Sequence, residues 1–274
     1  MTDSNAEQIE YWNGPVGERW ARLQETIDNN LGEITKGLMP FAAARPGERV
    51  LDIGCGCGTT TILLLKSVAP DGNVTGVDVS QPMLAVAQSR GASANFMHAD
   101  ASTHLFHPTH DLVFSRFGVM FFADPVAAFV NIRKALKPHG RLAFVCWRDV
   151  KENLWASAPF AAARALLPPQ EAADPLAPGP FAFADAARLK DILSKAGYRD
   201  IRIEKLDSVM NMGATPEEAA KQALNIGPLA RAAAELDEAA REKVIAVVRD
   251  ALAEYASPAG ITPLAACWLL GAKV

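Results

Sequence analysis

The stretch VLDIGCGCGTTT, residues 50–61, decides how this chain folds. An apolar run ends in Asp52 and leads into a turn with glycine at alternate positions, Gly54, Gly56 and Gly58. Glycine is needed where a backbone adopts a positive φ or where a ligand lies against it without a Cβ in the way. The threonines that follow predict a helix start, whose free N–H groups favour anionic or accepting groups. Strand, glycine turn and helix together predict the ligand-binding corner of a doubly wound α/β sheet.

The glycine spacing departs from the dinucleotide-binding pattern G-x-G-x-x-G. Counted from Gly54, the third glycine would fall at Thr59, and counted from Gly56 it would fall at Thr61. The string instead resembles motif I of the class I S-adenosylmethionine (SAM) dependent methyltransferases. That motif is a hydrophobic pair followed by D-x-G-x-G-x-G, and residues 50–58 match it without departure.

Further runs resemble the later motifs of the same family, in its order. Residues 73–77 are a short β-branched run that predicts a second strand, which ends at Asp78. A carboxylate at that place can accept both hydroxyl protons of a ribose. The resemblance of GVDVSQPMLAVA, residues 76–87, to the second motif implies this role for Asp78. Residues 95–97 predict a third strand, and the resemblance implies that Asp100 after it binds the adenine amino group.

Two more runs extend the resemblance to roughly residues 48–148, somewhat over a third of the chain. HDLVFSRFGVMFF, residues 110–122, resembles motif IV, and KPHGRLAFVCW, residues 137–147, resembles the turn and fifth strand after it. The family resemblance implies a SAM site made of the glycine turn and the ends of the neighbouring strands. Its residues would be Asp52, Gly54, Cys55, Gly56, Gly58, Thr60, Asp78, Val79, Met83, Asp100, Ala101 and Ser115.

Composition narrows the class of protein. The 274 residues, half of them hydrophobic, are enough for one large domain or one domain plus a cap. The net charge is −4 without a basic block, which argues against a nucleic-acid substrate. The first twelve residues lack the apolar segment of a signal peptide, and no apolar run approaches the length of a membrane span. We therefore expect a cytoplasmic protein with no membrane insertion, and leave its oligomeric state open.

The cysteine positions favour a reducing compartment. Cys55 and Cys57 lie in the glycine turn, whereas Cys146 and Cys267 lie in apolar runs. We expect all four to be reduced thiols. A metal site at the first pair would need a second Cys or His pair at ligand spacing, which the chain does not offer, so no metal is expected.

Residues 1–45 predict a helical lid ahead of the sheet. Apolar residues recur at intervals of three and four, the pattern of an amphipathic helix, at Trp20, Leu23, Ile27, Leu31, Ile34 and Leu38. Pro40 is expected to end this region. Tyr11 and Trp12 precede it, and two interpretations stay open for them: they close over the cofactor, or they anchor the helix to the core.

The next segment, residues 46–148, alternates strand and helix, with helices expected at 59–68, 82–90 and 125–136. Such alternation predicts a mostly parallel sheet with helices on both faces. The resemblance implies that this sheet is the family's seven-stranded Rossmann-like sheet with an antiparallel last strand. Ligands of such sheets bind beyond the carboxyl ends of the strands.

Three residues at that edge are candidates for an acceptor pocket: Arg116, Phe117 and Trp147. Arg116 could bind an anionic acceptor, the cofactor carboxylate or a lid acid such as Glu10, or form a purely structural ion pair. Trp147 could be a pocket wall or core filling. His98 is expected to be structural, and no other histidine is an obvious general base, so the catalytic residue is left unassigned.

The rest of the chain predicts a cap and the end of the sheet. Residues 149–180, rich in alanine and proline, follow the fifth strand at the ligand edge and are expected to be a cap segment. Residues 181–211 predict a core helix and the sixth strand. Residues 212–261 predict a helical cap insertion, and residues 262–274 the final core strand.

The resemblance implies methyl transfer from SAM to a small-molecule acceptor in a capped pocket, with S-adenosylhomocysteine as the product. The closest group is the type 11 methyltransferases, which include quinone C-methyltransferases. In-line placement of two reactants can lower a barrier by about 7–11 kcal/mol, so an acceptor that is already deprotonated needs no strong base. O-, N-, S- and C-methylation all remain open.

Two other functional classes remain. One is a SAM-binding protein of the same fold with a non-methylating or non-catalytic role, because binding motifs say nothing about turnover. The other is a nicotinamide-dependent oxidoreductase that uses the same sheet. The incomplete dinucleotide pattern and the lack of a recognisable catalytic Lys/Tyr or His set argue against the oxidoreductase.

Overall fold

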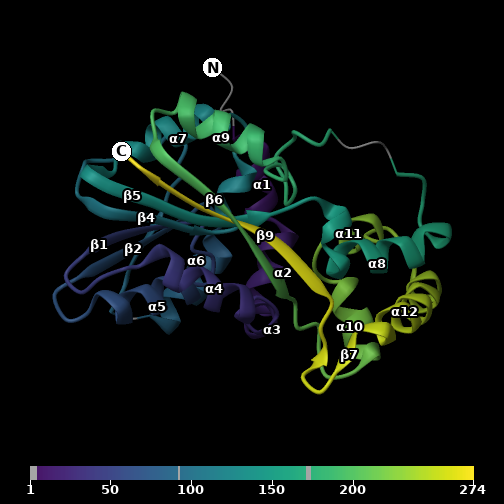
Figure 1. Ribbon diagram of the computed structural model, residues 1–274. Helices are drawn as coiled ribbons and strands as arrows, with labels where there is room; N and C mark the ends of the chain where they lie inside the picture. Colours follow the sequence, from purple (N-terminus) through teal and green to yellow (C-terminus); the bar gives the residue numbers. More distant parts are fainter. Residues whose placement is uncertain (1–4, 92, 171–173) are drawn as a thin grey trace.

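The computed structural model describes residues 5–91, 93–170 and 174–274. Within these residues seven strands form one sheet with the order β3-β2-β1-β4-β5-β9-β6 (Figure 1). β9 is antiparallel to both of its neighbours, and the other pairs are parallel. The predicted doubly wound sheet with an antiparallel last strand is therefore confirmed. Its strands are β1 (Arg49–Ile53), β2 (Asn73–Asp78), β3 (Asn95–His98), β4 (His110–Arg116), β5 (Leu136–Trp147), β6 (Arg199–Val209) and β9 (Leu264–Lys273).

Helices cover both faces of the sheet. α7 (Pro125–Arg133) and α9 (Ala186–Lys195) lie on one face, and α5 (Thr59–Val68) lies on the other (Figure 1). α6 (Gln81–Arg90) is capped by Ser80, whose hydroxyl accepts a hydrogen bond from the N–H of Met83. These helices were predicted, but α7 is shorter than expected. It ends three residues before Leu136, because Leu136 already pairs with the start of β4.

The N-terminal segment forms four helices instead of one continuous amphipathic region: α1 (Ala6–Asn13), α2 (Pro15–Arg22), α3 (Gln24–Asn30) and α4 (Gly32–Ala42). The predicted stop at Pro40 is wrong, because α4 continues past it to Ala42. A proline inside a helix removes one backbone hydrogen bond. Ile34 and Leu38, both fully buried, provide the packing that offsets this loss.

A second group of helices lies beyond the carboxyl end of β5 (Figure 1). It consists of α8 (Leu154–Ala163), α10 (Pro216–Ala223), α11 (Pro228–Ala232) and α12 (Glu238–Leu252). The sequence predicted a helical insertion over 212–261, and the structure divides its helices at Gly227, the N-cap of α11, and again before α12. α12 buries Val244, Val248 and Leu252. A small hairpin, β7 (Ala256–Ser257) and β8 (Gly260–Ile261), was not predicted.

Short 3-10 turns join several elements: η1 (Gly118–Phe121), η2 (Val150–Glu152), η3 (Arg164–Leu166) and η4 (Ala253–Tyr255). The predicted segments 1–45 and 149–180 contain residues 1–4 and 171–173, which lie outside the described residues. None of the helices in the described part of the chain is long and apolar enough to span a membrane.

Candidate functional site

The glycine turn connects β1 to α5 in a backbone conformation that other residues rarely adopt. Gly54, Gly56 and Gly58 have φ values of +68°, +53° and +81°. A Cβ on Gly54 would lie 2.6 Å from the Cα of Gly118, in the turn after β4. The turn therefore needs glycine both for its φ angles and for the close approach of a neighbouring loop.

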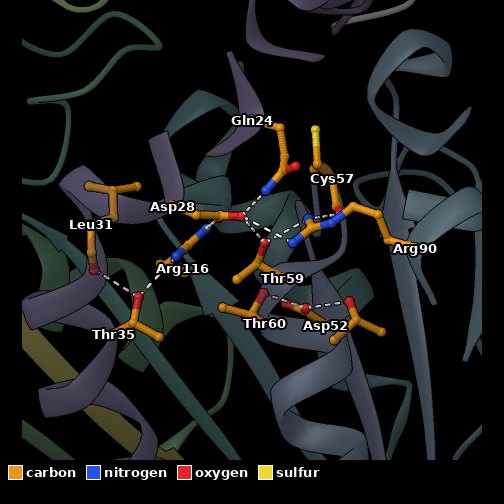
Figure 2. Close-up of polar contacts among 12 residues, drawn as sticks. Gln24, Asp28, Leu31, Thr35, Asp52, Cys57, Thr59, Thr60, Arg90 and Arg116 are labelled. Atoms are coloured by element: carbon orange, nitrogen blue, oxygen red, sulfur yellow. Dashed lines mark hydrogen bonds and ion pairs between the residues drawn. The ribbon is translucent and has the colours of Figure 1, made fainter. Parts of the chain in front are cut away.

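Asp52 lies beneath this turn and has no solvent exposure. Its Oδ2 accepts a hydrogen bond of 2.7 Å from the Thr60 hydroxyl (Figure 2). The Thr61 hydroxyl donates to the same oxygen at 2.7 Å. Its Oδ1 is buried without a hydrogen-bond partner among the described residues. Burial raises the pKa of Asp52 to about 6, although the two hydroxyls oppose the shift. The Thr60 side chain, a predicted cofactor contact, is thus already bonded to the protein.

Asp78 ends β2 and lies beside the glycine turn. Its two carboxylate oxygens accept 2.8 Å hydrogen bonds from the N–H groups of Gly56 and Ser80. Burial raises the pKa of this carboxyl, and those backbone donors oppose the shift. The Cys55 N–H bonds to the Val77 oxygen, which draws the turn and the end of β2 together. β1 lies between β2 and β4, so this corner is where the strand order reverses.

Asp100 follows β3 on the same edge of the sheet. Its carboxylate accepts 2.8 Å bonds from the N–H and the hydroxyl of Ser102. His98 approaches the Val79 oxygen at 3.0 Å through Nε2, which fits the structural role expected of it. Ala101 and Met83 are both buried at this corner. The predicted acids Asp52, Asp78 and Asp100 thus lie at the ends of three adjacent strands.

The N-terminal helices contact this corner through hydrogen bonds between side-chain and main-chain atoms. The Ser80 hydroxyl donates to the backbone oxygen of Trp12 at 2.7 Å. Asn13 donates to the Val79 oxygen at 2.8 Å and accepts from the Gln81 N–H at 3.0 Å. Sequence reasoning missed Asn13, whose only signal was its place in a Trp-Asn-Gly-Pro turn. α1 is therefore joined to the start of α6 next to Asp78.

The aromatic rings at the N-terminus differ in their surroundings. The Trp12 ring makes edge-to-face contacts with Tyr11, Trp20 and Phe121 at 5.2–5.5 Å between centroids. Tyr11 is 42% exposed. A cleft of about 400 Å³ lies beside the hydrogen bonds of Asn13, and it is lined by Ala6, Ile9, Glu10, Asn13, Gln81 and His98. The Trp12 ring thus packs against other aromatic rings, whereas Tyr11 lies at the surface.

Arg116 at the end of β4 forms an ion pair, and its partner is an acid of the N-terminal helices. Its Nη2 lies 3.4 Å from Oδ1 of Asp28, and its Nη1 donates to the Thr35 hydroxyl at 2.9 Å (Figure 2). Burial lowers the pKa of the guanidinium, and Asp28 opposes the shift. The lid acid suggested from the sequence was Glu10, and the structure replaces it with Asp28. Sequence reasoning missed Asp28, which carries no motif.

Aromatic side chains dominate the side of the site that faces the second helix group. Phe117 has φ +65°, which is costly for a bulky residue, and its ring stacks on Trp147 at 4.2 Å. Trp147 also contacts Trp155 of α8 at 4.8 Å. Ser115 has no exposed surface and donates from its hydroxyl to the Ile53 oxygen at 2.7 Å, so it joins β4 to β1.

A second arginine at this edge, Arg148, is also internally paired. It donates to the carboxylates of Glu152 and Asp207, and its guanidinium lies 5.2 Å from the Trp268 ring centre. The cysteines Cys55, Cys57, Cys146 and Cys267 are all free thiols. In the described ranges, no group of three His, Cys, Asp or Glu side chains is placed to hold a metal ion.

Comparison with known families identifies this corner. Residues 50–140 match the family model described as a methyltransferase domain. This part of the chain is a class I SAM-dependent methyltransferase domain. SAM is the cofactor of this class, and the strand order β3-β2-β1-β4-β5-β9-β6 agrees with the assignment. The resemblance inferred from residues 48–148 is confirmed.

One relative matches a longer stretch of the chain than the family model does. The demethylmenaquinone methyltransferase of Staphylococcus aureus is 31% identical over 156 residues, which cover 55% of this chain and 64% of that protein. The chain thus spans slightly less than two thirds of that relative.

Two solved structures share the fold of the methyltransferase domain. Phosphoethanolamine N-methyltransferase 2 of Haemonchus contortus, solved with SAM, is 18% identical with a TM-score of 0.60. The match covers 100% of this chain and 60% of that one. The YcgJ protein of Bacillus subtilis is 18% identical with a TM-score of 0.58, over 88% of this chain and 97% of that one. At these identities the likeness concerns the fold alone.

Proposed function

We propose that this chain binds SAM at the glycine turn and transfers its methyl group to a small-molecule acceptor, releasing S-adenosylhomocysteine. The observation that carries the proposal is the Asp78 carboxylate beside the turn. Each of its oxygens accepts one backbone N–H, from Gly56 or Ser80, and keeps a further lone pair. The two hydroxyls of a ribose are the donors that fit these acceptors.

The surrounding residues fit the other parts of the same cofactor. Asp100 after β3 would accept from the adenine amino group. The buried Oδ1 of Asp52, which lacks a donor among the described residues, fits the cationic amino group of the methionine part. The first N–H groups of α5, beginning at Thr59, fit its carboxylate. Bound SAM supplies an electrophilic methyl group, so the chain's task is to hold the two reactants in line and to exclude water.

The acceptor we propose is uncharged and aromatic. Two of the proteins named above act on chemically different acceptors: the relative's name gives a quinone, and the name of the Haemonchus contortus enzyme gives a phosphorylated amine. Arg116 and Arg148, the arginines found at this edge, are both already paired with acids. An anionic acceptor would have to compete with those internal partners. The ring of Phe117, stacked on Trp147, and the tilted ring of Trp155 beside it favour a flat apolar acceptor instead.

The helices α8 and α10–α12 would cover the acceptor, and α1–α3 would cover the cofactor. This arrangement of cap and lid belongs to the proposal, as do the segment boundaries drawn from the sequence. The four free cysteines are compatible with a cytoplasmic location, which we include in the proposal.

The test begins with calorimetric titration of the purified chain with SAM, S-adenosylhomocysteine and NAD. We expect the two sulfur ligands to bind and NAD to give no signal. A substituted naphthohydroquinone and phosphoethanolamine are then incubated separately with SAM and the chain, and mass spectrometry detects a gain of one methyl group.

The outcomes separate the remaining classes. Methylation of the hydroquinone alone supports the whole proposal. Methylation of phosphoethanolamine supports methyl transfer but contradicts an uncharged aromatic acceptor. SAM binding without any methylated product in a wider acceptor screen favours the non-methylating role, and NAD binding favours an oxidoreductase.

A further inference from the structure

Asp28 in α3 touches three separate segments around the glycine turn (Figure 2). Its Oδ2 accepts from the Thr59 hydroxyl at 2.5 Å and lies 3.2 Å from Nη2 of Arg90. Its Oδ1 lies 3.4 Å from Nη2 of Arg116. Gln24, one turn earlier in the same helix, donates to the same carboxylate. One acid of the N-terminal helices is therefore bonded to the start of α5, the end of α6 and the end of β4.

The partners of Asp28 are themselves attached to the glycine turn. Thr59 follows Gly58 directly and is the first residue of α5. Arg90 donates to the Cys57 backbone oxygen at 2.7 Å and to the Thr59 hydroxyl at 2.9 Å. Any movement of α3 away from the turn must break this set of bonds.

The charge balance beside the glycine turn depends on Asp28, which faces two arginines. Among the described residues it is the acid within ion-pair distance of both Arg90 and Arg116. The side chains of Asp28 and Arg116 are 18% and 12% exposed, so water screens their interaction only weakly. Without the carboxylate, two arginines would face each other beside the cofactor site with no opposite charge between them.

Other acids and contacts of the N-terminal helices differ from this arrangement. Glu33 in α4 pairs with Lys36 of its own helix, and both side chains are at least half exposed. Trp12 and Asn13 make neutral hydrogen bonds to the start of α6. The cluster around Asp28 is thus the charged attachment of these helices to the glycine turn.

We propose that Asp28 is a positioning residue that fastens the N-terminal helices over the cofactor site. It holds Thr59 and Arg116 in place, and its bonds break when the helices move aside for cofactor exchange. This inference rests on the proposed function, because it assumes that SAM and its product occupy the glycine turn.

The test compares Asp28→Asn with the unmodified full-length chain. Asparagine keeps the shape of the side chain but removes the charge that attracts both arginines. We expect S-adenosylhomocysteine to dissociate at least about tenfold faster, as for the loss of a charge-assisted hydrogen bond. Stopped-flow tryptophan fluorescence measures that rate. The KM for SAM should rise by a similar factor while kcat is unchanged or higher, a split that general destabilisation would not produce.

Three further variants complete the design. Glu33→Gln removes an acid of the same segment and should leave the dissociation rate unchanged. Asp28→Glu keeps the charge and should restore slow dissociation in part. Arg90→Gln, at a side chain 29% exposed, serves if Asp28→Asn does not fold, and should also speed dissociation.

Dissociation from Asp28→Asn and Arg90→Gln at the unmodified rate would overturn this inference while leaving the proposed function intact. Acceleration by Glu33→Gln equal to that by Asp28→Asn would overturn it as well. If the unmodified chain binds neither SAM nor S-adenosylhomocysteine, the proposed function itself fails, and the inference fails with it.

Discussion

At the scale of single residues, Asp52 combines burial with incomplete hydrogen bonding. Both threonine hydroxyls bond to its Oδ2, while its Oδ1 has no donor in the described part of the chain. Burial raises the pKa of this carboxyl to about 6, whereas an aspartate in an unfolded chain has a pKa of about 3.9. The folded state therefore holds the proton more tightly, and folding stability depends on pH through this group.

The first prediction follows from the sign of that shift. Between about pH 4 and about pH 6 the folded chain binds more protons at Asp52 than the unfolded chain, so stability falls as pH rises and levels off above this window. Asp52→Asn removes this contribution. Relative to that of the unmodified protein, the free energy of unfolding of the variant should rise by up to roughly 3 kcal/mol from the low-pH end to the high-pH end of this window. Urea unfolding of both proteins at both ends of the window measures this change. If the two proteins differ in unfolding free energy by the same amount at both pH values, the raised pKa of Asp52 is contradicted.

The second prediction concerns Asp78. Asp78→Ala removes the carboxylate proposed to accept from the ribose hydroxyls, and SAM should bind about 10–100-fold more weakly, equivalent to about 1.5–3 kcal/mol. Calorimetry measures the affinity. Asp111→Ala is the matched control, because Asp111 lies at the opposite edge of the sheet and pairs with Lys137. Unchanged SAM affinity in Asp78→Ala would refute the ribose assignment.

At the scale of elements, the glycine turn is the most constrained connection of the site. Gly54 needs both its positive φ and the space occupied by Gly118. Gly47, at the turn before β1, has φ +82° but no atom within 4 Å of an added Cβ. A substitution at Gly47 therefore tests backbone strain alone, whereas one at Gly54 tests strain together with a steric clash.

The third prediction uses this pair of glycines. Gly47→Ala should cost only the left-handed strain, about 1–2 kcal/mol of unfolding free energy. Gly54→Ala adds a collision with backbone at 2.6 Å, so it should cost clearly more and should also abolish SAM binding. Urea unfolding and calorimetry provide the two measurements. Equal destabilisation by both substitutions would show that the loop after β4 moves aside freely.

At the scale of the whole molecule, the N-terminal helices bridge the cofactor corner and the second helix group. Arg19 in α2 approaches the Asn225 backbone oxygen at 3.5 Å. The Asn30 amide, oriented to satisfy its neighbours, donates to the Asn211 oxygen at 2.6 Å and lies 3.0 Å from Oε1 of Gln222 in α10. A change at the cofactor corner can therefore reach the helices proposed to cover the acceptor.

The fourth prediction is that cofactor binding protects both groups of helices together. Adding S-adenosylhomocysteine should slow amide hydrogen exchange in α1–α3 and also in α10, because the two groups share the contacts around Asn30. Hydrogen-exchange mass spectrometry measures this by peptide, with α9 on the far face as the internal control. Protection confined to the glycine turn would mean that the two helical groups move independently.

Local sequence determined the framework of this protein. The glycines at 54, 56 and 58 specified a positive-φ turn, and Ser80, Asp124 and Asp185 specified helix starts, because caps act on backbone groups within three residues. The alternation of strand and helix determined the parallel sheet, and with it the edge at which the acids of three strands meet. These features depend on short-range rules that the chain carries in each segment.

Only the tertiary structure decided how distant segments pair. Asp28 and Arg116 are 88 positions apart, and Arg148 and Asp207 are 59 positions apart, so no local pattern indicates either pair. α4 passes through Pro40 because buried packing against the sheet offsets one lost hydrogen bond. The physical reason is the same in each case. Conformation within a segment is set by neighbours along the chain, whereas charge pairing and burial are set by what the folded sheet brings into contact.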